Sequence, residues 1–240
     1  MEASLKAKSA FGVLLLEWFG KNGRCFPWRE KKDPYQILIA EIMLQRTKAD
    51  QVVPVYLDFM REFPTIDDLK AASVKQIKRY FATLGLLWRA DRIKQMAEDI
   101  SERFNGKIPS DRDQLLSIPS VGDYMADAVL AFAYGKDVAV VDSNVCRVIG
   151  RVFGLDWKKE ARRKPVFRNI PSKLLPQGKA RKFNWAIIDL ASVVCLPREP
   201  LCLKCPLRII CEFAKETHGP PTSGARALIS SGKRSKVILR

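Results

Sequence analysis

Helical periodicity is the feature of this sequence that most constrains its fold. Three windows place apolar residues at positions i, i+3, i+4 and i+7, the spacing that lines one face of an α-helix. These windows are Ile93-Met96-Ala97-Ile100, Met125-Ala128-Val129-Phe132 and Val145-Val148-Ile149-Val152. The only β-rich run, VAVV, covers four residues at 138–141. The sequence therefore predicts a nearly all-α protein with about ten helices.

The balance of charge indicates a polyanionic partner. The 240 residues include 42 Lys and Arg against 26 Asp and Glu, a formal net charge of +16, and the sequence pI is about 9.8. Apolar residues make up 47% of the chain, enough for a globular core. Such an excess of positive charge favours nucleic acid over a solvated basic surface, which is the plainer alternative.

No stretch of the sequence is apolar for long enough to span a bilayer. The short apolar run in residues 1–20 is interrupted by Glu17 and Trp18, and no small-residue cleavage site follows it. We interpret it as an amphipathic helix with Phe11, Leu15 and Trp18 on one face, and not as a signal peptide. A cytoplasmic protein is expected, in a reducing compartment where six cysteines point to metal or to buried thiols.

Four of the cysteines lie close together near the end of the chain, in CLPREPLCLKCPLRIIC. Their spacing is C-x6-C-x2-C-x5-C, so the four thiols can converge on one centre. Thiolates suit either tetrahedral zinc or an iron-sulfur cluster, and a single C-x2-C knuckle favours the cluster. The same segment carries Arg198 and Lys204, which a pinned loop would present to phosphate groups. The ligand candidates are Cys195, Cys202, Cys205 and Cys211.

A turn at residues 117–123, SIPSVGD, joins two predicted helices. Backbone N–H groups at the start of the second helix make such a turn a ready anion site. Ser120, Val121 and Gly122 would then grip a phosphate without regard to base sequence. An ordinary corner between two helices explains the same pattern equally well.

Two acidic residues are candidates for chemistry. Asp142, in VVDSNVCRV, precedes an amphipathic helix whose dipole favours its ionised form. A helix cap is the simpler role for it, but Ser143 could supply the cap and leave Asp142 free. Glu41 lies in the apolar run QILIAEIMLQRT, so it is either on a solvated polar stripe or partly buried with a raised pKa suited to proton donation.

Taken together and in this order, IPSVGDYMADAV, AVVDSNVCRVIGRVFG and the four-cysteine spacing resemble the helix-hairpin-helix DNA glycosylases that carry an iron-sulfur cluster, the endonuclease III superfamily. The resemblance runs from about Phe26 to Cys211. It implies a [4Fe-4S] cluster on the four cysteines. Within the superfamily, FPWR, DPYQILIAEIMLQRT and FNWAIIDLASVVC resemble the branch of adenine and archaeal-type thymine mismatch glycosylases.

The resemblance also implies two helical domains, with DNA bound across the cleft between them and the target nucleotide flipped into it. One is a helical barrel that holds the hairpin. The other joins the N-terminal helix to the cluster region, and a basic, flexible tail follows. The predicted bounds are 34–136 for the barrel, about 111–134 for the hairpin motif, 1–33 and 137–218 for the second domain, 195–211 for the cluster loop, and 219–240 for the tail.

By position, the resemblance assigns Asp142 as the catalytic aspartate, which stabilises the cationic sugar and orients water. Glu41 matches the acid that protonates or hydrogen-bonds the leaving base. Gln45 matches the residue that wedges into the base stack, and Arg46 follows it beside the orphaned base or a phosphate. Asn144 is expected at the DNA as well.

Tyr124 stands where bifunctional relatives carry a Schiff-base lysine. Because tyrosine cannot form an imine, the resemblance implies a monofunctional enzyme with little or no strand cleavage. Lys136 is the alternative amine. One departure from the pattern is Ser120, which replaces the first of two hairpin glycines, and a left-handed conformation there would cost energy.

Length separates the candidate substrates. Adenine enzymes of this branch usually have a further C-terminal domain, whereas this chain ends soon after the cysteines. The leading hypothesis is a monomeric, nucleoid-associated enzyme of a prokaryotic cell that excises thymine or uracil from G·T and G·U in double-stranded DNA. The alternatives are an adenine glycosylase acting opposite G or 8-oxoguanine, a non-catalytic DNA-binding protein, and a zinc-dependent nucleic-acid binder.

Overall fold

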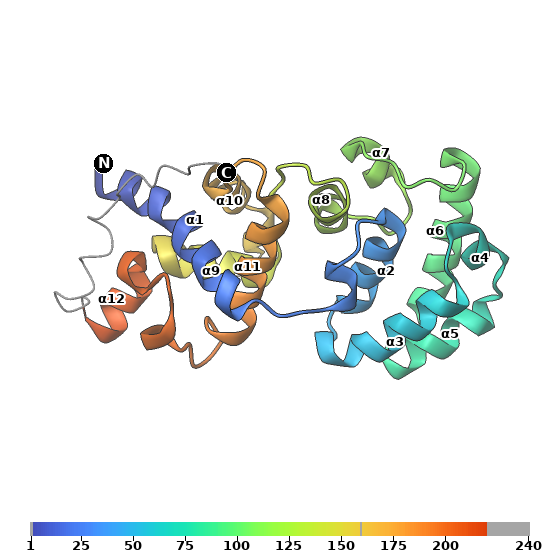
Figure 1. Cartoon of the computed structure of the whole chain (residues 1–240), viewed down its shortest axis with the longest axis horizontal. Coiled ribbons are helices and arrows are strands. Elements are labelled where there is room, and N and C mark those ends of the chain that lie inside the picture. The colour runs from blue at the N-terminus through green and yellow to red at the C-terminus, as the bar shows by residue number, and fades with distance from the viewer. Residues whose placement is uncertain (1, 159, 220–240) are drawn as a thin grey trace, which may run out of the picture. The chain divides into compact units, whose positions relative to one another are not determined.

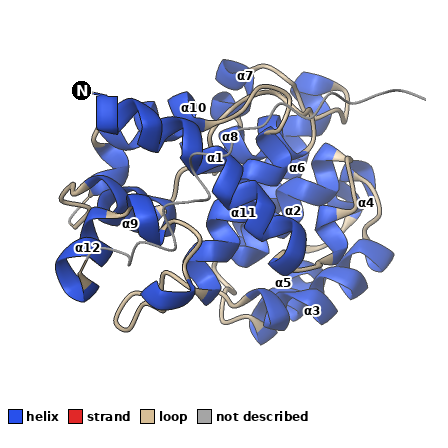
Figure 2. Ribbon diagram, turned by 60° about the vertical axis from the view of Figure 1, so that its left-hand side comes forward, coloured by secondary structure: helices blue, strands red, loops and turns tan. Residues whose placement is uncertain are grey.

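The computed structural model describes residues 2–158 and 160–219 (Figure 1). Every regular element in those ranges is a helix, which confirms the all-α prediction (Figure 2). Four single 3-10 turns, η1 to η4, lie between longer helices. The α-helices are α1 (Glu2–Asn22), α2 (Pro34–Leu44), α3 (Ala49–Glu62), α4 (Ile66–Ala71), α5 (Val74–Thr83), α6 (Arg89–Phe104), α7 (Arg112–Ser117), α8 (Asp123–Phe132), α9 (Ser143–Phe153), α10 (Val166–Leu174), α11 (Ala180–Val193) and α12 (Glu212–His218).

The periodic apolar faces predicted from the sequence are the buried faces of α6, α8 and α9. All twelve of their residues are at most 3% exposed. Burying this much apolar surface is the main favourable contribution to folding, because each fully buried aliphatic side chain contributes about 1.5–3 kcal/mol. In the described ranges, no helix combines the length and the apolar character that crossing a membrane requires.

The chain divides into two compact units. One of them comprises residues 24–140 and 177–181, and its core is built around α2. Every residue of α2 from Ile37 to Met43 is buried, because α2 packs against α3 on one side and α8 on another. That burial on all sides explains why its sequence is a continuous apolar run and not an alternating one.

This α2 unit begins about ten residues before the predicted barrel boundary at Pro34. The ring of Phe26 stacks on that of Trp28 at 5.0 Å, and Trp28 meets the edge of Tyr56 in α3 at 5.4 Å. Both Phe26 and Trp28 are buried in this core. The segment 24–33 therefore folds with the α2 unit.

The other unit comprises residues 1–23, 141–176 and 182–240, of which the last 21 lie outside the described residues, as does nearly all of the predicted basic tail. Helix α9 packs against α10 and α12, and α1 packs against α10. Phe11 of α1 lies 6.2 Å from Phe153 and 6.1 Å from Phe183, ring centre to ring centre. Phe11 is fully buried, as the amphipathic reading of the N-terminal segment predicts.

Candidate functional site

The predicted hairpin is formed by α7, a five-residue turn and α8. Arg112 at the start of α7 clamps it, because its Nε donates to Asp127 Oδ1 at 2.9 Å and its Nη2 donates to Asp123 Oδ1 at 2.5 Å. The hydrogen bond to the largely buried Asp127 raises the pKa of Arg112 above its ordinary value. Residues outside the turn therefore hold the two helices together.

The turn itself contains the strain that the missing glycine predicts. Ser120 has a φ of 68°, in the left-handed region where a side chain costs energy. The N–H of Val121 donates to the Ile118 carbonyl at 3.1 Å, so this group is used within the turn. Helix α8 begins after Gly122 without a side-chain cap, and both Ser120 and Gly122 are exposed.

Glu41 is buried in the middle of α2, with 6% of its surface exposed. This resolves the alternative posed by the sequence, since Glu41 does not lie on a solvated stripe. The hydroxyl of Tyr124, in the first turn of α8, donates to Glu41 Oε2 at 2.9 Å. The packing of α2 on α8 brings these two residues together although 83 positions separate them. The geometry supports a carboxyl group that is shielded from water and held in one orientation.

Gln45 and Arg46 follow directly after α2. Gln45 is the C-cap residue, and its amide Nε2 donates to the sulfur of Met125 in α8 at 3.0 Å. Arg46 is exposed. Its φ is 66°, so Arg46, like Ser120, is a non-glycine residue in the left-handed region. The backbone thus turns sharply at Arg46, directly after Gln45, the residue that the resemblance assigns to the base stack.

Sequence reasoning missed the residues that share a pocket with Gln45 and Ser120. The pocket is an open cavity of about 400 Å³, and Trp88, Arg89 and Arg92 from the start of α6 line it. Arg89 is buried, and its Nη1 donates to the Ile42 carbonyl at 2.5 Å. The signal in the sequence was WRADR, an aromatic residue followed by two arginines where a helix begins.

Asp142 is the N-cap residue of α9, so Ser143 does not take that role. The Oδ1 atom of Asp142 accepts the Val145 N–H at 2.7 Å, and its Oδ2 accepts the Asn144 side-chain amide at 2.7 Å. Asp caps a helix well because its carboxylate reaches the backbone donors of the first turn. Capping therefore fixes the carboxylate, which remains partly exposed and retains lone pairs for another partner.

Asn144 links Asp142 to a buried arginine. Its carbonyl oxygen accepts Nη1 of Arg147 at 2.9 Å. Arg147 is buried, and it also donates to the backbone carbonyls of Ala191 and Cys195 at 2.9 and 3.0 Å. We call the hydrogen-bonded series Asp142, Asn144, Arg147 and Cys195 the relay. The sequence did not predict this series, because the periodic apolar face of α9 does not include Arg147.

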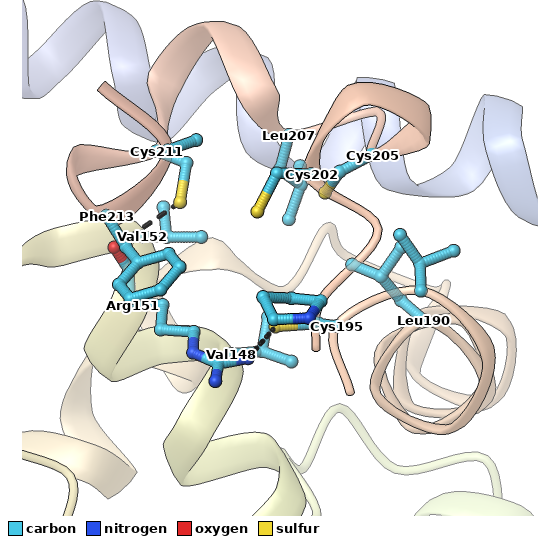
Figure 3. A pocket seen from close by; sticks show the side chains of 13 residues that line it. Val148, Arg151, Val152, Leu190, Cys195, Cys202, Cys205, Leu207, Cys211 and Phe213 are labelled. Carbon is cyan, nitrogen blue, oxygen red and sulfur yellow. Dashed lines mark hydrogen bonds between the residues drawn. The ribbon is translucent and has the colours of Figure 1, made fainter. Parts of the chain in front are cut away.

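The four clustered cysteines line one cavity between α9, α11 and the loop that follows α11 (Figure 3). Their side chains point toward a common space of about 360 Å³, whose walls include Val148, Val152 and Leu190. Among the described residues, no three Cys, His, Asp or Glu side chains form a group ready to hold a single metal ion. The lining of the cavity contains four soft thiols and no carboxylate or imidazole, a donor set that fits an iron-sulfur cluster.

Burial and a neighbouring arginine set the electrostatics around this cavity. Burial raises the pKa of Cys205 to about 12 and that of Cys211 to about 11, so as free thiols both are protonated at neutral pH. A metal centre would offset this cost by binding the thiolates. Arg151 lies beside them, with Nη1 donating to the Cys195 sulfur at 3.3 Å and to the Leu196 carbonyl at 2.6 Å. Arg151 is a further residue that sequence reasoning missed.

The remaining DNA-contact candidates, Arg198 and Lys204, are on the surface of the same loop. Arg198 and Lys204 are both exposed, where a phosphate could reach them. Lys136, the alternative amine, is exposed and donates to the Ser110 carbonyl. Of the two cysteines outside the cluster, Cys146 is buried and Cys25 is exposed.

Comparison with known proteins provides an independent line of evidence. Residues 39–169 match the family model described as HhH-GPD superfamily base excision DNA repair protein. A thymine/uracil-DNA glycosylase of Pyrobaculum aerophilum is 40% identical over 211 residues, which are 85% of this chain and 91% of that protein. The solved structure of a thermostable thymine-DNA glycosylase has a TM-score of 0.85 and 33% identity, and the match covers 89% of this chain and 99% of that one.

Adenine glycosylases are also similar, but over a smaller share of their length. The adenine DNA glycosylase of Buchnera aphidicola subsp. Baizongia pistaciae is 33% identical over 203 residues. That match covers 84% of this chain and only 58% of the relative.

Proposed function

Because the chain belongs to the HhH-GPD superfamily of base excision DNA repair proteins, we propose that it is a monofunctional DNA glycosylase that removes thymine or uracil mispaired with guanine. The observation that carries the reaction class is the buried Glu41 carboxyl group, held by the Tyr124 hydroxyl at 2.9 Å. The similarity to thymine and thymine/uracil glycosylases, along almost their whole length, supports the choice of substrate.

In the proposed reaction, the bond between C1′ of the deoxyribose and N1 of the flipped base breaks, and its electron pair leaves with the base. Glu41 donates a proton or a hydrogen bond to the departing base. Asp142 stabilises the positive charge that develops on the sugar, which a fixed carboxylate binds better than it binds the neutral ground state. Water then adds to C1′ and loses its proton to Asp142.

Tyr124 provides no amine for the sugar, so the proposed product is an abasic site in an intact strand. Its proposed role is to hold Glu41 and to line the space for the flipped base. The hydrogen bond between the two side chains supports this role. The exposed Lys136, whose ammonium group donates to a backbone carbonyl, is a weaker candidate for imine chemistry.

The proposed DNA contacts come from several segments. Gln45 enters the base stack, and Arg46 lies beside it. The turn residues Ser120, Val121 and Gly122 approach a phosphate group, with the backbone of Gly122 exposed to it. The other proposed contacts are Asn144, Arg198 and Lys204. Acting on DNA as a monomer, the enzyme would work at the nucleoid.

We propose further that Cys195, Cys202, Cys205 and Cys211 hold a [4Fe-4S] cluster, for which the all-thiol lining of their cavity is the support. When bound, the cluster would supply four iron–sulfur bonds that pin the loop 195–211. The chain's own contribution is to shield it with Val148, Val152 and Leu190. Protein that is colourless and holds zinc would overturn this assignment, whereas a broad visible absorbance supports it.

The experiment that tests the function uses labelled duplexes containing G·T, G·U, A·8-oxoguanine or A·G, with and without hot alkali after incubation. Base loss from G·T and G·U, detected as strand breaks only after alkali, is the expected result. Base loss confined to the adenine duplexes would establish the second candidate, an adenine glycosylase, which the similarity to adenine relatives supports. Cutting without alkali would overturn the monofunctional assignment.

A further inference from the structure

The pocket at the end of α2 brings together residues from three separate segments. Gln45 and Ser120, both assigned to DNA contacts by the resemblance, line it with Trp88 and Arg92. Its floor is apolar, formed by Ile42 and by side chains of α6 and α8. No carboxylate is among the residues that line it. The pocket is open to solvent and is lined by both apolar and polar side chains.

Three arginines gather around this pocket. Burial lowers the pKa of Arg89, and the nearby positive charges of Arg46 and Arg92 lower it further. Like charges placed this close repel one another, so their arrangement is unfavourable in the protein alone. An acceptor-rich partner would remove that cost. The charge pattern therefore indicates a ligand with oxygen or nitrogen acceptors.

Trp88 contacts Arg92, one of the two exposed arginines of this group. Trp88 is 52% exposed, an unusual position for so large an apolar residue, and the guanidinium carbons of Arg89 and Arg92 lie 4.8 and 4.9 Å from its ring centre. An arginine packed against an aromatic ring loses less freedom when its planar donors bind a planar partner. Trp88 thus presents the guanidinium group of Arg92 in a restricted orientation.

We propose that Arg92 recognises the guanine left unpaired opposite the excised base, and that Trp88 is its positioning residue. Guanine presents two neighbouring acceptors, O6 and N7, which match the paired donors of an arginine. Adenine replaces O6 with an amino donor that an arginine cannot satisfy. This inference rests on the proposed function, since an enzyme for mispaired thymine or uracil must act opposite guanine and spare pairs with adenine.

Binding to duplexes that need no chemistry tests this directly. Each duplex carries a tetrahydrofuran abasic-site analogue opposite either guanine or adenine, and dissociation constants are measured at one fixed salt concentration. Wild-type protein is expected to bind the guanine duplex about tenfold or more tightly than the adenine duplex. Arg92→Ala should bring this ratio close to one by weakening only guanine binding. Arg92→Lys should keep only part of the ratio, because a lysine ammonium can also donate to O6 and N7 but lacks the fixed planar geometry of a guanidinium group.

Two controls separate base recognition from general effects. Lys75→Ala removes one positive charge from an exposed position of α5 outside the pocket, and it should leave the ratio unchanged. Trp88→Ala should lower the ratio, and Trp88→Phe should keep most of it because a ring remains for Arg92. Equal weakening of both duplexes by Arg92→Ala would mark a phosphate contact and overturn the proposal, as would a wild-type ratio near one. Failure of the proposed function appears separately, as absence of excision from G·T and G·U.

Discussion

Glu41 and Asp142, the two carboxyl groups assigned to catalysis, are held in different ways. Glu41 is buried by the packing of α2 on α8, and it accepts a hydrogen bond from the Tyr124 hydroxyl. Asp142 is partly exposed at the end of a helix, and both of its oxygens accept hydrogen bonds from α9. Packing thus fixes the group proposed to act on the base, whereas hydrogen bonds fix the group proposed to act on the sugar.

Burial of Glu41 and hydrogen bonding of Asp142 suit their proposed roles at the base and at the sugar. A carboxyl group that gives a proton to a base benefits from exclusion of water, which strengthens its interaction with the base. A carboxylate that stabilises a developing cation must keep its charge and its orientation, which N–H donors provide. The relay behind Asp142 extends this support to the cysteine loop through Arg147.

Breaking the relay should have the largest effect. Arg147→Ala removes three hydrogen bonds and leaves the carbonyls of Ala191 and Cys195 without this donor. We expect a loss of about 3 kcal/mol in the free energy of unfolding, together with a lower excision rate. Thermal or denaturant unfolding measures the first and single-turnover excision the second.

Asn144→Ala is the matched control for the relay, because it cuts the link to Asp142 but leaves Arg147 bonded to both carbonyls. It should lower the excision rate with a much smaller loss of stability. If Asn144→Ala keeps the full rate, the relay does not position Asp142. If Arg147→Ala unfolds no more easily than wild type, the three hydrogen bonds are not stabilising.

Tyr124→Phe tests whether the Tyr124 hydroxyl orients the buried Glu41. The substitution removes the hydrogen bond to Glu41 and keeps the ring, so α2 and α8 should still pack. We expect about a tenfold lower excision rate with nearly unchanged DNA affinity, since one hydrogen bond contributes roughly 1.4 kcal/mol. An unchanged rate would show that the Tyr124 hydroxyl is not needed to orient Glu41.

Ser120→Gly should have the smallest effect, and it changes stability in the opposite direction. Because Ser120 has a φ of 68°, glycine relieves strain there, and the expected gain in the free energy of unfolding is about 0.5–1 kcal/mol after the added entropy of the unfolded chain. Ser110→Gly, at an exposed position whose φ is not positive, is the control and should give no gain. A destabilised Ser120→Gly protein would show that the serine side chain contributes to the turn.

Local patterns predicted much of this fold, because residues three and four positions apart in the sequence form one face of a helix. The faces of α6, α8 and α9 follow directly from their spacing, and so does the grouping of the four cysteines around one cavity. The position of Ser120 even predicted its strain.

What the sequence could not provide depends on contacts between distant segments. Whether Glu41 was solvated or buried depended on α8, which packs on α2 from 83 residues away. Asp142 and Ser143 are both good cap residues, and only the backbone geometry selects Asp142. Arg147 and Trp88 gain their roles from the carbonyls and side chains that surround them, and no local pattern encodes those neighbours.

Glu41 is proposed to act on the leaving base and Asp142 on the sugar. Changing the leaving base distinguishes these two roles. Single-turnover excision of uracil and of 5-fluorouracil, each opposite guanine, is measured for wild type, Glu41→Gln and Asp142→Asn. The Asn variant keeps a good helix cap, so its fold should be preserved.

A base that carries negative charge more easily needs less help from an acid. We therefore expect 5-fluorouracil to recover about tenfold or more of the rate lost in Glu41→Gln and little of the rate lost in Asp142→Asn. Equal recovery in both variants, or recovery only in Asp142→Asn, would contradict it.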